Sequence, residues 1–279
     1  MVSSLRRYIP RPVWNVLRKS KNIGPDLLDA VDSLTGRRDP LVPPHRMFRL
    51  IGHGNFKKTG EEFFGYFTRF GLKPEHNVLD IGCGVGRMAI PLTRFLKGNY
   101  EGFDIVPYEV EWCSRSITPR FPNFHFRVAD IFNEGYNPRG KIAGKDYRFP
   151  YPDGSFEFCY LTSVFTHMLP DELNNYLREI RRVLKPSGRC LATCFLLNEE
   201  SEALIAKGKS KLNFAYTNGR CKVVNPEVPT DAVGYPEGDM EAMLKEAGLA
   251  LLSKHYGSWC VRKEILSYQD ILVLEKPAS

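Results

Sequence analysis

The sequence predicts an α/β protein in which helices cover both faces of a mostly parallel sheet. Short apolar runs alternate with segments of helical periodicity through most of the chain, and this alternation is typical of parallel sheets. A glycine-rich segment at residues 82–86 joins the first apolar run to a helical one. With 43% hydrophobic residues, the 279-residue chain also has enough apolar side chains for one large core.

The predicted elements follow in order along the chain. The first is a helix over residues 59–70, with Thr59 as its N-cap and phenylalanines at helical spacing on one face. Strands are then predicted at 77–81, 100–105, 124–129, 156–161 and 190–196, and helices at 87–96, 109–117, 171–184 and 237–247. The turn at 186–188 is expected to stop the helix before the fifth strand. Strands at 249–255 and 270–274 complete the fold, and because no full helix joins them, we expect the last to run antiparallel.

Residues 1–56 are predicted to form a basic N-terminal arm and a segment that covers the pocket, ahead of a domain at 57–279. Residues 1–49 carry ten Lys or Arg and four Asp, so most of the net charge of +7 lies there. We predict that residues 1–21 contact a membrane surface or an acidic partner, or that the arm packs on its own domain or on a dimer mate. The protein is expected to be a monomer or a homodimer.

The sequence argues against several other kinds of protein. No apolar run approaches the roughly 20 residues that span a bilayer, and no signal-peptide stretch is found, so we predict a cytoplasmic protein. Seven cysteines without a CxxC pair predict neither a disulfide framework nor a metal site, and Cys190 and Cys194 are expected to pack on one face of a strand. The basic residues are not interleaved with aromatic residues, so no nucleic-acid partner is expected.

The glycine-rich segment lies where an α/β sheet binds ligands, beyond the carboxyl end of a strand. Asp104 closes the second predicted strand, where an acid can accept hydrogen bonds from a ribose, and Asp130 closes the third, where a side chain can contact an adenine. Arg87 stands where a dinucleotide site has glycine or alanine. Asp80 precedes the glycines and suits a cationic ligand. S-adenosylmethionine has a sulfonium, an ammonium and no phosphate.

Residues 77–87 (NVLDIGCGVGR) resemble the first motif of class I S-adenosylmethionine-dependent methyltransferases, and 149–157 and 178–189 resemble later segments of that family in the same order. The resemblance implies a Rossmann-like, doubly wound sheet of seven strands with the last antiparallel, and S-adenosylmethionine as cofactor. By the same resemblance, residues 198–235 form a substrate cap inserted after the fifth strand. The cofactor-binding residues are then expected to be Asp80, Gly82, Cys83, Gly84, Gly86, Arg87, Asp104, Ile105, Asp130, Ile131, Ser163 and Val164.

The acceptor of the methyl group is expected near the end of the fourth strand. His167 is the candidate catalytic residue, because histidine ordinarily titrates near neutrality and can deprotonate a hydroxyl group; the alternative is that it only lines the pocket. This region lacks the Asn/Asp-Pro-Pro-Tyr motif of enzymes that methylate nucleobases or glutamine, which favours a small-molecule acceptor methylated on oxygen. The candidate substrate-binding residues are Arg46, Arg49, His53, Tyr256 and Trp259, with Gln269 also near the cleft.

Other functions stay open from the sequence alone. The acceptor atom can be nitrogen or carbon instead of oxygen. A nicotinamide-dependent oxidoreductase uses a similar glycine turn, although Arg87 argues against it. A third alternative is a non-catalytic cofactor-binding module that docks through its basic arm.

Overall fold

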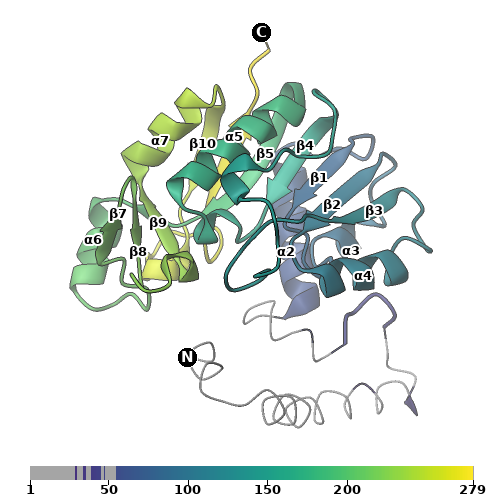
Figure 1. Ribbon diagram of the computed structural model, residues 1–279, viewed down its shortest axis with the longest axis horizontal. Helices are drawn as coiled ribbons and strands as arrows, with labels where there is room; N and C mark the ends of the chain where they lie inside the picture. The colour runs from purple at the N-terminus through teal and green to yellow at the C-terminus, as the bar shows by residue number, and fades with distance from the viewer. Residues whose placement is uncertain (1–28, 30–33, 36–38, 45–46, 48–54, 279) are drawn as a thin grey trace.

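A seven-stranded sheet with helices on both faces forms the centre of the protein, shown in the computed structural model of Figure 1. The structure describes residues 29, 34–35, 39–44, 47 and 55–278. The sheet order is β10-β11-β5-β4-β1-β2-β3. Its strands are β1 (Val78–Ile81), β2 (Tyr100–Asp104), β3 (Phe124–Val128), β4 (Phe156–Leu161), β5 (Leu184–Cys194), β10 (Ala250–His255) and β11 (Asp270–Glu275).

The strand directions confirm the predicted sheet. β1 pairs in parallel with both β2 and β4, β2 pairs in parallel with β3, and β4 with β5. β11 runs antiparallel to both of its neighbours, β5 and β10. From β1 the chain builds first toward β2 and β3 and then, on the other side, toward β4 and β5. Ligands of open α/β sheets bind beyond the carboxyl ends of the strands where the strand order reverses. In this sheet the strand order predicts a ligand site at the ends of β1 and β4.

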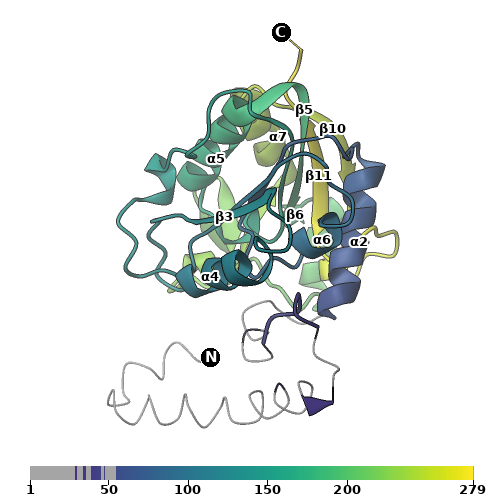
Figure 2. The ribbon, with the colours of Figure 1, turned by 90° about the vertical axis from the view of Figure 1, so that its right-hand side faces the viewer.

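Side chains alternate between the two faces of the strands, and each face packs on a different set of helices. One face packs on α2 (Phe56–Arg69), α3 (Ala89–Leu92) and α4 (Pro107–Ser116), through residues such as Phe67, Tyr100 and Phe158. The other packs on α5 (Pro170–Val183) and α7 (Glu237–Glu246). Figure 2 shows α2 and α5 on opposite sides of the strands. Cys190 and Cys194 both lie in the second of these clusters, which confirms that they pack on one face.

Two helices differ from their predicted bounds. α2 begins at Phe56 and not at Thr59, because the Asn55 side chain caps it by accepting a hydrogen bond from the Lys58 backbone N–H. The helix predicted at 87–96 is reduced to α3 at Ala89–Leu92. It contains Pro91, which has no N–H for the helical hydrogen-bond ladder. The apolar spacing was correct in both cases, but the local backbone chemistry set the ends.

The turn at 186–188 was predicted to separate the helix from the fifth strand, and this prediction is wrong. β5 already begins at Leu184, directly after α5, so the turn lies inside the strand. The register with β4 shifts between Phe156 and Phe158, whose partners in β5 are Leu184 and Arg189. The turn is therefore an irregularity inside β5. The strand continues through it because β5 pairs with β4 both before and after the turn. β5 also ends at Cys194, two residues before the predicted end.

A second, smaller sheet follows β5 in the region where no period was found in the sequence. Its order is β6-β9-β8-β7, built from β6 (Leu196–Leu197), β7 (Tyr216–Asn218), β8 (Cys221–Val223) and β9 (Val233–Pro236). The helix α6 (Glu199–Ala206) accompanies it, and Figure 1 shows both beyond one edge of the large sheet. Phe195, Phe214 and Trp259 pack together beneath this unit. Its strands are too short to show a period in the sequence.

Some of the described residues ahead of α2 contact the domain. Met47 is buried against Phe56 and Val85, and Asp39 forms an ion pair with Lys57 at 2.6 Å. None of the helices in the described part of the chain is both long and apolar enough to cross a membrane.

Candidate functional site

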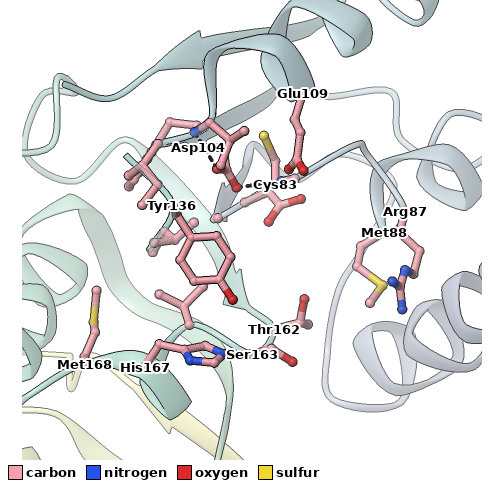
Figure 3. Close-up of a pocket in the computed structure, with 18 of the residues that line it drawn as sticks. Cys83, Arg87, Met88, Asp104, Glu109, Tyr136, Thr162, Ser163, His167 and Met168 are labelled. Atoms are coloured by element: carbon pink, nitrogen blue, oxygen red, sulfur yellow. Dashed lines mark hydrogen bonds between the residues drawn. The ribbon is translucent and has the colours of Figure 1, made fainter. Parts of the chain in front are cut away.

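A cavity of about 560 Å³ opens at the carboxyl ends of β1, β2 and β4 (Figure 3). This size lies within the range of pockets for small ligands, about 300–1,000 Å³. It is lined by the turn after β1, the ends of β2 and β4, the loop after β3 and the start of α4. The cavity therefore lies where the reversal of strand order predicts a ligand.

The turn after β1 needs glycine for two separate reasons. Gly82 has φ 85° and Gly84 has φ 51°, in the left-handed region that other residues rarely adopt. A Cβ atom on Gly82 would also lie 2.5 Å from Cγ2 of Val164, which follows β4. The backbone N–H groups of Gly82 and Cys83 both donate to the carbonyl of Phe103 in β2. The turn is thus fixed between β2 and the segment after β4.

Asp104 holds the glycine turn from the end of β2. Its Oδ2 accepts a hydrogen bond from the Gly84 N–H at 2.8 Å, and its Oδ1 accepts one from the Val106 N–H at 2.9 Å. Burial raises the pKa of Asp104, and the two backbone donors act in the opposite direction. Because a carboxylate offers about four lone-pair sites, Asp104 can still accept hydrogen bonds from a ligand in the cavity.

Asp80 at the end of β1 is a second acidic group in the lining, and only 1% of it is exposed. The Tyr100 hydroxyl donates to its Oδ2 at 2.6 Å, whereas its Oδ1 has no hydrogen-bond partner among the described residues. Burial raises the pKa of Asp80 to about 7, and the hydrogen bond from Tyr100 limits the rise. A cation in the cavity would stabilise the ionised form of this carboxyl group.

Ser163, just after β4, has a strained backbone at the edge of the cavity. Its φ is 61°, unusual for a residue with a side chain. Its N–H donates to Oγ1 of Thr193 in β5, and Oε1 of Gln269 accepts hydrogen bonds from both hydroxyl groups, at 3.1 Å from Ser163 and 2.6 Å from Thr193. These bonds hold the backbone in that conformation, and such strain is concentrated at functional sites.

His167 lies across the cavity from Asp104, beside the ring of Tyr136 from the loop after β3 (Figure 3). The two rings meet edge to face, with centroids 5.9 Å apart. Nδ1 of His167 lies 2.8 Å from the carbonyl oxygen of Thr230. A carbonyl can only accept, so Nδ1 carries a hydrogen, and in the neutral ring Nε2 then keeps a lone pair.

Most residues expected to bind the cofactor line this cavity. They are Asp80, Gly82, Cys83, Gly84, Arg87, Asp104, Ile105, Ile131, Ser163 and Val164, and the candidate base His167 joins them. Gly86 does not line it, although its N–H closes the turn by donating to the Cys83 carbonyl. Asp130 does not line it either. It is exposed, and its Oδ1 accepts from the Lys141 N–H at 3.3 Å.

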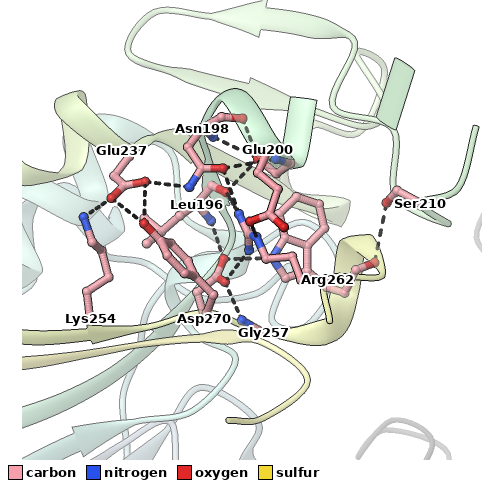
Figure 4. A network of polar contacts seen from close by, with 12 residues as sticks. Leu196, Asn198, Glu200, Ser210, Glu237, Lys254, Gly257, Arg262 and Asp270 are labelled. Carbon is pink, nitrogen blue, oxygen red and sulfur yellow. Dashed lines mark hydrogen bonds and ion pairs between the residues drawn. The ribbon is translucent and has the colours of Figure 1, made fainter. Parts of the chain in front are cut away.

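Two of the candidate substrate-binding residues, Tyr256 and Trp259, do not line this cavity. Arg46, Arg49 and His53 lie outside the described residues. Tyr256 donates to Glu237, and Trp259 donates to Asp270, both within a buried polar network that joins β11 to β6 and α6 (Figure 4). Gln269, the third candidate late in the sequence, does line the cavity, next to Ser267 and Tyr268.

Sequence reasoning missed several lining residues, of which Glu109 and Tyr136 are the most informative. Glu109 lies in the first turn of α4, only 6% exposed. The sequence could have indicated Glu109, because α4 begins just after β2 and its first turn therefore lies near the end of that strand. Tyr136 had no such signal, because it is on a loop whose path depends on the isolated bridges Ile131↔Ile142 and Asn133↔Asn137.

Comparisons with known proteins agree with this geometry. Residues 79–192 match a family model described as a methyltransferase domain. A sterol 24-C-methyltransferase of Schizosaccharomyces pombe is 27% identical over 147 residues, which are 53% of this chain and 34% of that protein. The tRNA N(3)-cytidine methyltransferase METTL2 of Mus musculus is 21% identical over 210 residues, which are 75% of this chain and 48% of that protein.

Solved structures resemble the fold over most of the chain. A SAM-dependent methyltransferase from Aquifex aeolicus has a TM-score of 0.53 and 18% identity, covering 86% of this chain and 99% of that one. By contrast, the chain spans only about a third of the length of the sterol methyltransferases that it matches. The sequence matches include the glycine turn, the acid after β2 and the segment up to β5.

Proposed function

Because the chain belongs to the class I S-adenosylmethionine-dependent methyltransferase superfamily, we propose that it methylates a hydroxyl oxygen of a small, largely apolar acceptor. S-adenosylmethionine supplies an electrophilic methyl group on a sulfonium. The protein then has to hold this group in line with the acceptor atom and remove one proton.

The residues of the cavity fit this cofactor. Asp80 has an unpartnered buried oxygen, and a negative group of this kind suits the ammonium or the sulfonium. Asp104 retains accepting capacity for ribose hydroxyls. The glycine turn lets the ligand approach the backbone at Gly84, which has no side chain in the way.

The proposal of an oxygen acceptor rests on one observation, the contact between Nδ1 of His167 and the carbonyl of Thr230. Because Nδ1 is hydrogen-bonded to the Thr230 carbonyl, Nε2 is the nitrogen that can accept a proton, and His167 lines the cofactor cavity. A base near the methyl group is useful when the acceptor is a hydroxyl, which must lose its proton during transfer.

The cavity rim supports an apolar acceptor. Phe132, Tyr136 and Tyr268 all line the cavity, yet they are 50%, 46% and 55% exposed. Aromatic side chains left partly exposed around a pocket are typical of binding sites for ligands with apolar surface.

A carbon acceptor is the second candidate. The relatives named sterol 24-C-methyltransferases have a carbon acceptor in their names, and two of them match 53% and 42% of this chain. Replacing a hydrogen on carbon by a methyl group also releases one proton overall, so His167 can serve both candidates.

The test is transfer of a labelled methyl group. The protein is incubated with methyl-labelled S-adenosylmethionine and a panel of phenols, sterols and a lipid extract, and mass analysis locates the label. We expect the label on a hydroxyl oxygen of an apolar compound. Label on a carbon supports the second candidate, and absence of label from every small molecule contradicts the proposal.

Replacing His167 tests its role. The change His167→Ala should lower kcat by about 10²- to 10⁴-fold, the usual contribution of a general base, while the Kd for S-adenosylmethionine stays the same. His125→Ala is the matched control, because His125 lies on β3 outside the cavity lining and pairs with Glu101. An unchanged kcat in His167→Ala leaves His167 as a wall residue only.

A further inference from the structure

Glu109 is a buried acidic residue that the proposed mechanism does not use. It stands in the first turn of α4, and only 6% of it is exposed. It faces the glycine turn, since a Cβ atom on Gly84 would lie 3.4 Å from its Oε2. Figure 3 shows its carboxyl group near Cys83 and Asp104, on the wall of the cavity.

The carboxyl group of Glu109 has no hydrogen bond or ion pair with any residue that the structure describes. Asp104 differs, since both of its oxygens accept backbone hydrogen bonds. The oxygens of Glu109 are not among the fully buried polar atoms that lack a partner, so they are open to the cavity that Glu109 lines. Its place in the cavity wall therefore points to a partner that is a ligand.

The surroundings of Glu109 offer little positive charge. Burial, followed by the nearby charge of Asp104, raises the pKa of Glu109 to about 8. Arg87 is the positively charged side chain in the same lining, and burial lowers its pKa. The other titratable groups that interact with Glu109 or line the cavity beside it are Asp80, Cys83, Asp104, Tyr108, Cys113 and Tyr136. All of these are neutral or negative.

We propose that Glu109 makes the cofactor pocket selective for positively charged S-adenosylmethionine over its neutral product, S-adenosylhomocysteine. The two compounds share the adenosine, the ammonium and the carboxylate. They differ in one methyl group and in the positive charge of the sulfonium. The inference rests on the cofactor of the proposed function, and it assigns Glu109 a part in exchanging product for substrate.

The selectivity has a definite dependence on pH. In the ligand-free protein at neutral pH, most Glu109 side chains are protonated. A cation in the pocket favours the ionised form, so binding of S-adenosylmethionine releases a proton, and its affinity rises with pH. S-adenosylhomocysteine keeps the ammonium, which can act on Asp80, but it has no sulfonium charge to ionise Glu109. The preference for S-adenosylmethionine should therefore increase between about pH 6 and pH 9, around the pKa of Glu109.

The experiment measures the Kd of both compounds by calorimetry across this pH range, in buffers of different ionisation enthalpy. In the wild-type protein we expect S-adenosylmethionine to release more protons than S-adenosylhomocysteine, whose ammonium can still ionise Asp80. Glu109→Gln should abolish this difference in proton release, remove the pH dependence of the Kd ratio and lower the preference at high pH by about tenfold, the effect of one pKa unit of coupling. Glu109→Met is a second variant that removes the carboxyl group with little change in length.

Glu111→Gln is the matched control, since it removes the same charge from α4 at an exposed position paired with Arg115. It should keep the wild-type ratio at every pH. The proposal is overturned if Glu109→Gln and Glu109→Met keep the wild-type ratio and its pH dependence, or if the wild-type protein binds neither compound. These readouts need no acceptor, so a failure of methyl transfer to small molecules leaves them unaffected.

Discussion

At the end of β1, Gly82 occupies a position where the backbone and its neighbour both exclude a side chain. Its φ of 85° is a left-handed value, and Val164 approaches the site of the missing Cβ atom to 2.5 Å. Val164 belongs to the segment after β4, so the glycine closes the contact between two strands that the sequence separates widely. The same position forms the wall of the cofactor cavity.

Gly82→Ala should therefore weaken both folding and cofactor binding. The strained backbone alone costs about 1–3 kcal/mol, and the displaced Val164 changes the cavity wall. Urea unfolding should show the loss of stability, and calorimetry an increase in the Kd for S-adenosylmethionine of at least about tenfold, or 1.4 kcal/mol.

Gly65→Ala is the control for Gly82→Ala. Gly65 lies in α2 with nothing within 4 Å of its missing Cβ atom, so alanine there should add about 0.5–1 kcal/mol of stability. If Gly82→Ala binds S-adenosylmethionine with the wild-type Kd, the close approach of Val164 to Gly82 is not needed for cofactor binding.

The sequence correctly predicted those cavity residues that lie at the ends of strands. Asp80 and Asp104 follow apolar runs, and the ends of parallel strands meet at one edge of the sheet. Tyr256 and Trp259 come from a segment without such an anchor, and the structure holds them in a network around Asp270 and Glu237. Side chains of this kind cannot be placed without the packing of the irregular segments.

Among the elements, the junction between β11 and the small sheet depends on one buried ion pair (Figure 4). The side chains of Arg262 and Asp270 are 1% and 0% exposed, and Nη1 of Arg262 lies 2.8 Å from Oδ1 of Asp270. Asp270 also accepts hydrogen bonds from the Leu196 N–H, the Gly257 N–H and the Trp259 indole. One carboxylate thus ties the segment at 257–262 to Leu196, which is distant in the sequence.

Arg262→Met should destabilise the protein by about 3–5 kcal/mol, because it leaves the buried charge of Asp270 without its cation. The measurement is urea unfolding. Arg220→Met is the control, since Arg220 pairs with Glu246 and Asp239 near the surface and should cost less than about 1 kcal/mol. Equal effects of the two changes contradict a special role for the buried pair.

Element ends, unlike element types, were set by local chemistry. Asn55 begins α2 before the apolar period becomes visible, and Pro91 shortens α3. β5 contains the turn that was expected to stop a helix, because pairing with β4 and β11 continues around it. Periodicity reports which face is buried, but capping and pairing decide where an element starts and stops.

Over the whole molecule, positive charge is concentrated at the N-terminus. Residues 1–21 carry six Lys or Arg and no Asp or Glu, together with Trp14 and Leu17. Such a segment is attracted to an anionic membrane surface, at about 1 kcal/mol for each basic residue near it. The described residues nearest to the domain, among them Met47, pack beside α2 and the glycine turn.

Deletion of residues 1–21 should abolish binding to vesicles that contain phosphatidylserine and leave the Kd for S-adenosylmethionine unchanged. Sedimentation with vesicles measures the binding, which should weaken with salt because exposed charges are screened. Uncharged vesicles are the control. If the full chain does not bind anionic vesicles and the deletion lowers Tm, the arm packs on the domain instead.

The sequence by itself determined the order of the main strands, the glycine turn with its acids and the family, because these depend on local patterns along single strands and turns. The tertiary structure alone decided that Val164, His167, Tyr136 and Glu109 surround one cavity, that Thr230 sets the tautomer of His167, and that a second sheet follows β5. The physical reason is that these features arise from contacts between segments far apart in the chain. Their geometry depends on how the whole core packs, and no single segment carries that information.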